Sequence, residues 1–168
     1  MKLCIGLFGT CGKSQWRTPF MERYREEGIE FFNPQVDDWK PEDATIEAEH
    51  LADDAIILFP VTGETLGMGS LSEVGFSILN AIKLDSQREF VVLIEDDVYD
   101  DAKETCVPRE AKDSARARAL VKQHLKKLRL SNLYVVETME EMLDVSLQLY
   151  SAARVRIPLQ RFNPHHQG

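Results

Sequence analysis

One glutamate, Glu73, stands where a carboxylate could act as a nucleophile. It follows a loop that contains three glycines, Gly63, Gly67 and Gly69. Glycines allow a backbone to approach a ligand closely, and the positive end of a helix keeps a nearby carboxylate ionised, as a nucleophile requires. The alternative role is structural, because Ser70-Leu71-Ser72-Glu73 matches a capping box, in which the glutamate binds the N–H of the cap residue. The local pattern leaves both roles open.

A polar loop also follows the apolar segment 29–32, and it contains Asn33, Asp37, Asp38 and the aromatic residue Trp39. Asn and Asp are typical turn residues, so this loop has a structural interpretation. The functional interpretation is that a carboxylate beside an aromatic ring hydrogen-bonds a ligand.

The loop Gly9-Thr10-Cys11-Gly12-Lys13-Ser14 ends like a phosphate-binding loop. The spacing does not fit, because such a loop needs a further glycine at position 7, which is Leu7. The GxGxxG spacing of a dinucleotide-binding loop is missing as well. A nucleoside triphosphatase is therefore not expected, whereas a loop that lines some other ligand is.

Short apolar segments alternate with segments of helical periodicity, and the strands are predicted over 3–8, 29–32, 56–61, 89–94 and 133–136. Such alternation predicts a parallel sheet with right-handed crossovers. We expect a single doubly wound α/β domain, flavodoxin-like or Rossmann-like, with five strands in the order 2-1-3-4-5. This order would bring together the carboxyl ends of strands 1, 2 and 3, where open α/β sheets bind ligands.

The helices are predicted over 16–27, 41–55, 71–82, 111–130 and 138–150. In the first, Trp16, Phe20 and Tyr24 share one face and are expected to pack in the core. In the second, surface exposure is the default for Glu47, Glu49 and His50. The Lys- and Arg-rich fourth helix is expected to be solvated, and a second capping box, Thr138 to Glu141, opens the fifth.

Two segments outside these elements are predicted to be solvent-exposed or peripheral. The acidic run 95–101 lacks the spacing of a calcium loop and is interpreted as a solvated loop rather than a Mg²⁺ or Ca²⁺ site. Residues 154–168 contain two prolines and no helical periodicity. We expect a domain over 1–153, followed by a tail that is either disordered or packs on a neighbouring subunit.

The composition fits one globular domain of 168 residues with a net charge of −8. The acidic excess argues against a nucleic-acid partner, which needs clustered Lys and Arg. No segment approaches the length of a membrane span, and Met1–Phe8 is too short for a secretion signal. Three cysteines without paired spacing favour reduced thiols, a cytoplasmic location and no zinc site.

Two motifs together resemble the nucleoside 2-deoxyribosyltransferase-like superfamily, in particular its smaller branch. The first motif runs from Gly9 to Arg17 and continues with Phe32-Asn33-Pro34 and Asp38-Trp39. The second is Gly67-x-Gly69-Ser70-x-x-Glu73-Val74-Gly75. The resemblance covers about residues 3 to 95, and the order and spacing of the two motifs carry it.

The resemblance implies an enzyme that exchanges the base of 2′-deoxynucleosides through a glycosyl-enzyme ester, without metal or organic cofactor. It makes Glu73 the nucleophile, and it matches Glu47, with Glu49 as the alternative, to an acidic residue of the preceding helix. Asp38 and Glu47 are candidates for the acid that serves the leaving base. Contacts to the nucleoside are expected from Gly9, Thr10, Trp16, Asn33, Gly67, Gly69 and Ser70. The resemblance also implies a homo-oligomer in which neighbours complete one another's sites.

The sequence departs from this family at one position. The transferases carry an aspartate six residues before the nucleophile that handles the leaving base, and here that position is Gly67. Two alternatives therefore remain open. One is an N-glycosidase that only hydrolyses nucleosides or their 5′-monophosphates, with Lys13, Ser14 and Arg17 available for a phosphate. The other is a catalytically silent module that binds a nucleoside or nucleotide.

Overall fold

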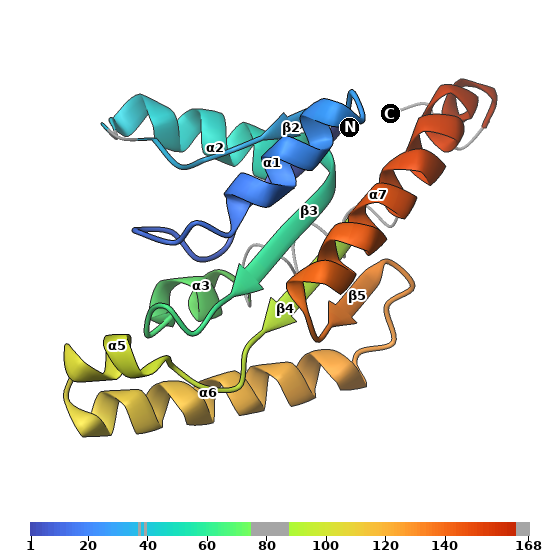
Figure 1. Ribbon diagram of the computed structural model, residues 1–168. Helices are drawn as coiled ribbons and strands as arrows, with labels where there is room; N and C mark the ends of the chain where they lie inside the picture. Colours follow the sequence, from blue (N-terminus) through green and yellow to red (C-terminus); the bar gives the residue numbers. More distant parts are fainter. Residues whose placement is uncertain (37, 39, 75–87, 164–168) are drawn as a thin grey trace.

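The computed structural model is an α/β fold built on one five-stranded parallel sheet with the strand order β2-β1-β3-β4-β5 (Figure 1). The strands are β1 (Lys2–Leu7), β2 (Phe31–Phe32), β3 (Asp54–Val61), β4 (Glu89–Ile94) and β5 (Leu133–Val136). The structure describes residues 1–36, 38, 40–74 and 88–163. The predicted fold class and strand order are confirmed.

Helices cover both faces of the sheet, as in a doubly wound fold (Figure 1). Helices α1 (Arg17–Glu26) and α7 (Met139–Arg156) pack on one face. Helices α2 (Pro41–Asp53), α3 (Met68–Glu73) and α6 (Pro108–Lys127) lie on the other. The remaining described helices are short: α5 (Asp100–Glu104) and the 3-10 helix η2 (Ile157–Phe162).

The central strands are buried along their whole length. Every residue of β3 and of β4 is buried, because helices cover both faces. This explains why both strands, after a first acidic residue, are continuous apolar runs rather than alternating ones. The stripe of Trp16, Phe20 and Tyr24 lies in the core under α1, as predicted. The carboxyl ends of β1 and β3 are thus held in place by the packed core on both faces of the sheet.

Helix α3 begins earlier than predicted. It starts at Met68 after Gly67, whose φ of 65° is left-handed, and Ser70 lies inside the helix. The capping-box interpretation of Ser70 and Glu73 is therefore wrong, because a residue inside the helix cannot be its N-cap. The part of the predicted helix from Gly75 to Ile82 lies outside the described residues.

Helices α6 and α7 also differ from the prediction. Two cations of α6 that were expected to be solvated are buried, with Arg118 0% and Lys122 8% exposed. The acidic run ends in the first two residues of the unpredicted helix α5, Asp100–Glu104. Helix α7 continues to Arg156 and is followed by η2, so the segment expected to be a tail is helical as far as Phe162.

No helix in the described part of the chain is long and apolar enough to cross a membrane.

Candidate functional site

A cleft of about 300 Å³ opens beyond the carboxyl ends of β1 and β2. Its walls come from the loop after β1, the loop after β2 and the middle of α2. The lining residues are Cys11, Gly12, Pro34, Gln35, Val36 and Glu47. The cleft lies at the edge of the sheet where the predicted strand order places a ligand site.

A buried arginine, Arg17, holds the loops around this cleft together. Its guanidinium donates to the backbone oxygens of Leu7 and Thr10 at 2.8 and 2.7 Å, and it lies 3.4 Å from Oε1 of Gln35. The side chain is only 2% exposed. Its donors are engaged by protein atoms, so the described contacts give Arg17 a structural role and do not support the phosphate contact suggested for it.

Two carboxylates from different helices interact electrostatically near the cleft, and one of them, Glu47, lines it. Glu47 comes from the middle of α2, and Glu73 is the last residue of α3. The side chain of Glu73 is exposed, but desolvation by the protein atoms around it raises its pKa, and the negative charge of Glu47 raises this pKa further. Burial also raises the pKa of Glu47, and the guanidinium of Arg17 offsets part of that rise. The two glutamates that the sequence singled out separately thus influence each other's ionisation.

Three residues of the first motif stabilise the loop after β1. Gly9 has a φ of 93°, and a Cβ there would lie 2.4 Å from the oxygen of Pro60, so only glycine fits. Thr10 is 1% exposed, and its hydroxyl donates to Pro60 and accepts from the N–H of Thr62. Trp16 is buried, and its indole N–H donates to the oxygen of Thr10 at 2.9 Å.

The loop after β2 shows turn chemistry. The side-chain oxygen of Asn33 accepts from the backbone N–H of Gln35 at 3.0 Å, as in an Asx turn. Asp38 is 90% exposed and pairs with Lys40 at 3.8 Å. No described contact joins Asp38 to the two glutamates. The other two predicted members of this loop, Asp37 and Trp39, lie outside the described residues.

The glycine loop after β3 packs on a buried arginine of α6. A Cβ on Gly67 would lie 2.8 Å from Nη2 of Arg118, and the residue also has a left-handed φ. An aspartate could not replace this glycine without strain. By contrast, a Cβ on Gly69 would meet nothing within 4 Å. Ser70 lies in the first turn of α3 and is partly exposed.

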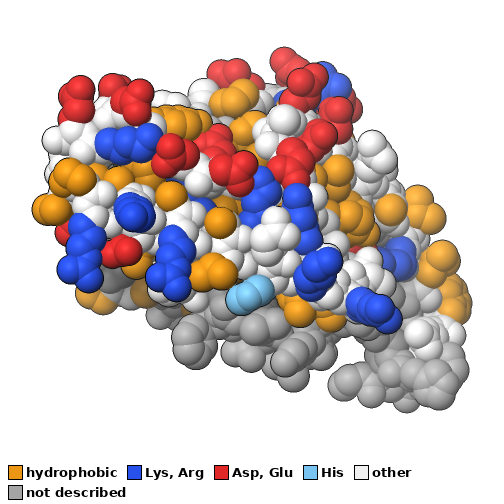
Figure 2. Space-filling view, turned by 90° about the horizontal axis from the view of Figure 1, so that it is seen from below, with side chains coloured by type: hydrophobic (Ala, Val, Ile, Leu, Met, Phe, Trp, Pro, Cys, Tyr) orange, Lys and Arg blue, Asp and Glu red, His pale blue; other side chains and the backbone are white. Residues whose placement is uncertain are grey.

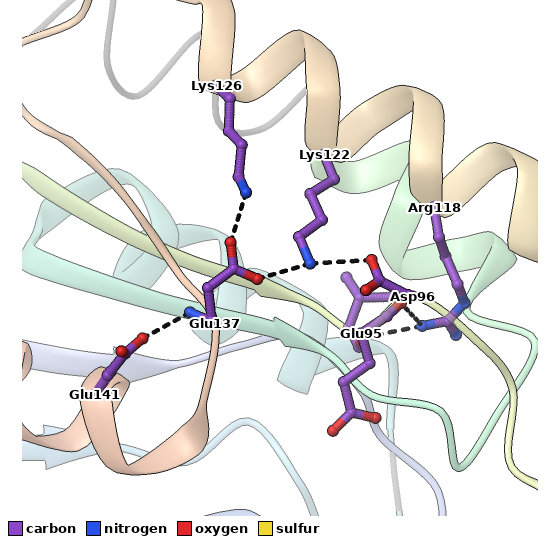
Figure 3. Close-up of polar contacts among 8 residues, drawn as sticks. Glu95, Asp96, Arg118, Lys122, Lys126, Glu137 and Glu141 are labelled. Atoms are coloured by element: carbon purple, nitrogen blue, oxygen red, sulfur yellow. Dashed lines mark hydrogen bonds and ion pairs between the residues drawn. The ribbon is translucent and has the colours of Figure 1, made fainter.

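Arg118 binds backbone oxygens of the loops that follow β3 and β4. The acceptors are Val61 at 3.0 Å, Thr62 at 2.9 Å, Thr65 at 2.8 Å and Glu95 at 3.2 Å. The side chain crosses from α6 toward these loops in Figure 3. It therefore fixes the path of the chain from β3 to Gly67, at the entrance to the helix that carries Glu73.

Further toward the C-terminus of α6, two lysines pair with acidic residues that follow β4 and β5 (Figure 3). Lys122 lies 3.0 Å from Asp96 and 2.8 Å from Glu137, and Lys126 also pairs with Glu137. These pairs lower the pKa of Glu137 to about 2. Figure 2, seen from below, shows Lys and Arg mixed with Asp and Glu on the face that carries α6, and no continuous basic surface there.

A second cleft, of about 450 Å³, lies between the loops after β1, β3 and β4. It is lined by Lys13, Ser14, Glu64, Thr65, Tyr99, Asp101 and Ala102. The hydroxyl of Ser14 is buried and has no hydrogen-bond partner among the described residues. The lining contains two carboxylates and one lysine, so the net negative charge of this cleft disfavours binding of a phosphate.

Sequence reasoning did not predict the roles of Gln35 and Arg118. Gln35 lines the first cleft and donates to the oxygen of Gly12 at 2.8 Å. Arg118 lies far from its partners in the sequence, in a helix with many other basic residues. No local pattern distinguishes such a cation from its solvated neighbours.

Comparisons of the chain with family models, with curated proteins and with solved structures found no match.

Proposed function

We propose that the protein transfers the 2-deoxyribosyl group of 2′-deoxynucleosides between bases, with Glu73 as nucleophile and Glu47 as its acid-base partner. The single observation that carries this proposal is that Glu47 lines the cleft and that its negative charge raises the pKa of Glu73 on the neighbouring helix α3. Retaining glycosidases use two carboxylates in these two roles. The resemblance of the motifs to the deoxyribosyltransferase superfamily supports the choice of substrate.

In the proposed first step, the ionised carboxylate of Glu73 attacks C1′ from the face opposite the base. The C1′–N bond breaks through an oxocarbenium-like transition state, and its electron pair leaves with the base. The missing 2′-hydroxyl favours this step, because an electron-withdrawing group there would destabilise the positive charge. The products are a deoxyribosyl ester of Glu73 and a base that takes up a proton.

Glu47 is the best-placed donor of that proton. Burial favours its protonated form, and it lines the cleft, whereas Asp38 is exposed and Gly67 has no side chain. In the second step, a nitrogen of the incoming base attacks C1′ and releases Glu73, while Glu47 takes a proton back. This sequence of steps balances without a metal ion or an organic cofactor.

The charge on Arg17 opposes this assignment in part, because a guanidinium near Glu47 favours its ionised form. The two roles could therefore be exchanged between the glutamates, and a trapping experiment distinguishes the two assignments. A 2-deoxy-2-fluoro-arabinosyl nucleoside slows both steps by destabilising the cation, and it allows the ester to accumulate. We expect peptide mass mapping to locate the sugar on Glu73; a sugar on Glu47 would reverse the roles.

The activity is tested by incubating the protein with deoxyinosine or deoxyuridine, with and without free adenine, and separating the products by chromatography. We expect deoxyadenosine with wild type and with Glu22→Gln, a control carboxylate on the exposed face of α1. We expect none with Glu73→Gln. No product across a panel of deoxynucleosides and their monophosphates would contradict the enzymatic proposal.

Two alternatives retain support. The absence of an acid at position 67 and the exposure of Asp38 would weaken the handling of a second base, which favours an N-glycosidase that only hydrolyses. Free base released at the same rate with and without adenine would establish it. A silent binding module would instead bind deoxynucleosides in calorimetry and release nothing.

A further inference from the structure

Three residues with metal-binding side chains meet at the opposite end of the sheet from the cleft. Cys4 lies early in β1, His50 lies in the last turn of α2, and Asp54 is the first residue of β3. One ligand atom from each lies within 4.8 Å of the other two. The three residues belong to three different elements, and Cys4 is far from the other two in the sequence. No local sequence motif therefore predicts the group.

The group lies in the interior rather than in a solvated acidic patch. Cys4 and Asp54 are both 0% exposed, and the side chain of His50 is 19% exposed. Nδ1 of His50 lies 3.0 Å from each carboxylate oxygen of Asp54. A buried carboxylate requires a compensating partner, and here that partner is an imidazole with a thiol beside it.

The surrounding structure fixes the orientation of these side chains. The ring of His50 stacks on Phe32 of β2 at 3.7 Å between centroids, with an interplanar angle of 3°. The backbone oxygen of Asp54 accepts from Nε of Arg88 at 2.7 Å. Gly6 leaves room for the carboxylate, since a Cβ there would lie 3.0 Å from Oδ2 of Asp54. The pairing of β1 with β3 is irregular between Lys2 and Ile5, next to Cys4.

We propose that Cys4, His50 and Asp54 bind a divalent transition-metal ion, with Zn²⁺ as the best fit. A thiolate, an imidazole and a carboxylate form a ligand set that zinc accepts in tetrahedral sites. Ligand atoms in such a site are roughly 3.3–3.8 Å apart, so small side-chain rotations bring this group to that geometry. The proposal runs against the expectation, drawn from cysteine spacing, that the chain has no zinc site.

The fourth coordination position of the proposed ion would face a cavity on the solvent side of the group. A cavity of about 170 Å³ adjoins His50 and Asp54 and is also lined by Lys2, Glu49 and Asp53. Water, or the carboxylate of Glu49 or Asp53, can complete the coordination from this cavity. The same opening gives the ion a path to the buried ligands.

Binding exchanges a proton for the ion. The thiol proton of Cys4 leaves as the metal–sulfur bond forms, so the affinity increases with pH. Burial and the charge of Asp54 raise the pKa of this thiol, with Glu30 adding to the rise and Lys2 opposing it. His50 must bind in its neutral form. The ion would then join β1, α2 and β3, and it would fix the end of the helix that carries Glu47 one turn earlier.

The test uses the full chain after treatment with a chelator, titrated with Co²⁺ under reducing conditions. We expect one equivalent of Co²⁺ to give the thiolate-to-cobalt charge-transfer absorption and tetrahedral d–d bands, and one equivalent of Zn²⁺ to abolish them. Zn²⁺ should also raise the Tm of the wild type, because an ion that binds only the folded state stabilises it.

The three cysteines provide matched controls. Cys4→Ser should lose the charge-transfer absorption and the Zn²⁺-dependent Tm shift, whereas Cys11→Ser and Cys106→Ser should keep both. His50→Gln should weaken Co²⁺ binding at least tenfold with the far-UV circular dichroism unchanged, and it tests the site even if Cys4→Ser does not fold. An absorption that disappears with Cys11→Ser, or no thiolate absorption in the wild type, would overturn the proposal.

Discussion

Glu47 and Glu73 are best understood through the charge that they share. Two nearby carboxylates disfavour simultaneous ionisation, and the partial burial of Glu47 strengthens this effect, whereas Glu73 is exposed. Arg17 compensates on the side of Glu47 only. The site therefore holds a proton more readily than two isolated glutamates would, and a pair that alternates between acid and anion needs this property.

The first prediction concerns Glu47→Gln. Removing the charge of Glu47 removes one of the two causes that raise the pKa of Glu73, so this pKa should fall while remaining above that of an exposed glutamate. Carboxyl ¹³C chemical shifts followed across a pH titration measure the change. Glu22→Gln should leave the titration of Glu73 as in the wild type. An unchanged midpoint in Glu47→Gln would mean that the two charges do not interact.

Gly67 and Gly69 provide a second, paired prediction. Gly67→Ala should destabilise the protein by about 1–3 kcal/mol, because alanine is strained at a left-handed φ and its Cβ would lie 2.8 Å from Arg118. Gly69→Ala should be neutral or stabilise by up to about 1 kcal/mol, since the site is open and helical. Urea unfolding of the two variants measures both changes. Equal stabilities would contradict the role assigned to Gly67.

At the scale of elements, α6 acts as a brace for loops that follow the central strands. Most helices contact a sheet through apolar side chains, and α6 does so through Leu125. Its buried Arg118 donates to the backbone oxygens of Thr62 and Thr65, which lie beyond the end of β3. The glycine loop before α3 thus depends on a residue about fifty positions later in the chain.

The third prediction is that Arg118→Met destabilises the protein by more than about 3 kcal/mol, since each buried carbonyl left without a donor costs about 1–3 kcal/mol. Any transferase activity should fall further than stability alone explains, because the loop that leads to Glu73 loses its support. Arg116→Met, an exposed position of the same helix, is the control and should change stability by less than about 0.5 kcal/mol. Urea unfolding and product chromatography measure the two effects.

At the scale of the whole molecule, the end of the described chain exposes apolar side chains. Val155 is 68%, Leu159 57% and Phe162 69% exposed, all within the last turns of α7 and η2. Neighbouring exposed apolar residues are typical of a protein–protein contact. This surface suits the expectation that the C-terminal segment packs on a neighbouring subunit.

The fourth prediction follows from that surface. Replacing Leu159 and Phe162 together by serine should reduce the molar mass measured by light scattering from that of an oligomer to that of the 19.2 kDa chain. Replacing Leu120 of α6, which is 49% exposed, by serine is the control and should leave the mass unchanged. A wild type that is monomeric at all concentrations would contradict the assembly.

The sequence by itself determined the sheet and the general location of the site. Strands β3 and β4 are largely apolar because helices bury both faces of the sheet. Their composition and their alternation with helices therefore predict a doubly wound parallel sheet. Topology then requires that the loops after β1, β2 and β3 converge. Glu73 and the glycine loop could be singled out in this way before any contact was known.

Only the tertiary structure decided which polar side chains act on the site and which support it. Arg17, Thr10 and Trp16 are residue types that often bind ligands, yet their polar groups donate to backbone oxygens inside the protein. Burial, not residue type, separates these roles, and burial depends on contacts between segments far apart in the chain. The grouping of Cys4, His50 and Asp54 has the same origin: three unremarkable positions become neighbours because β1 pairs with β3 while α2 returns alongside them.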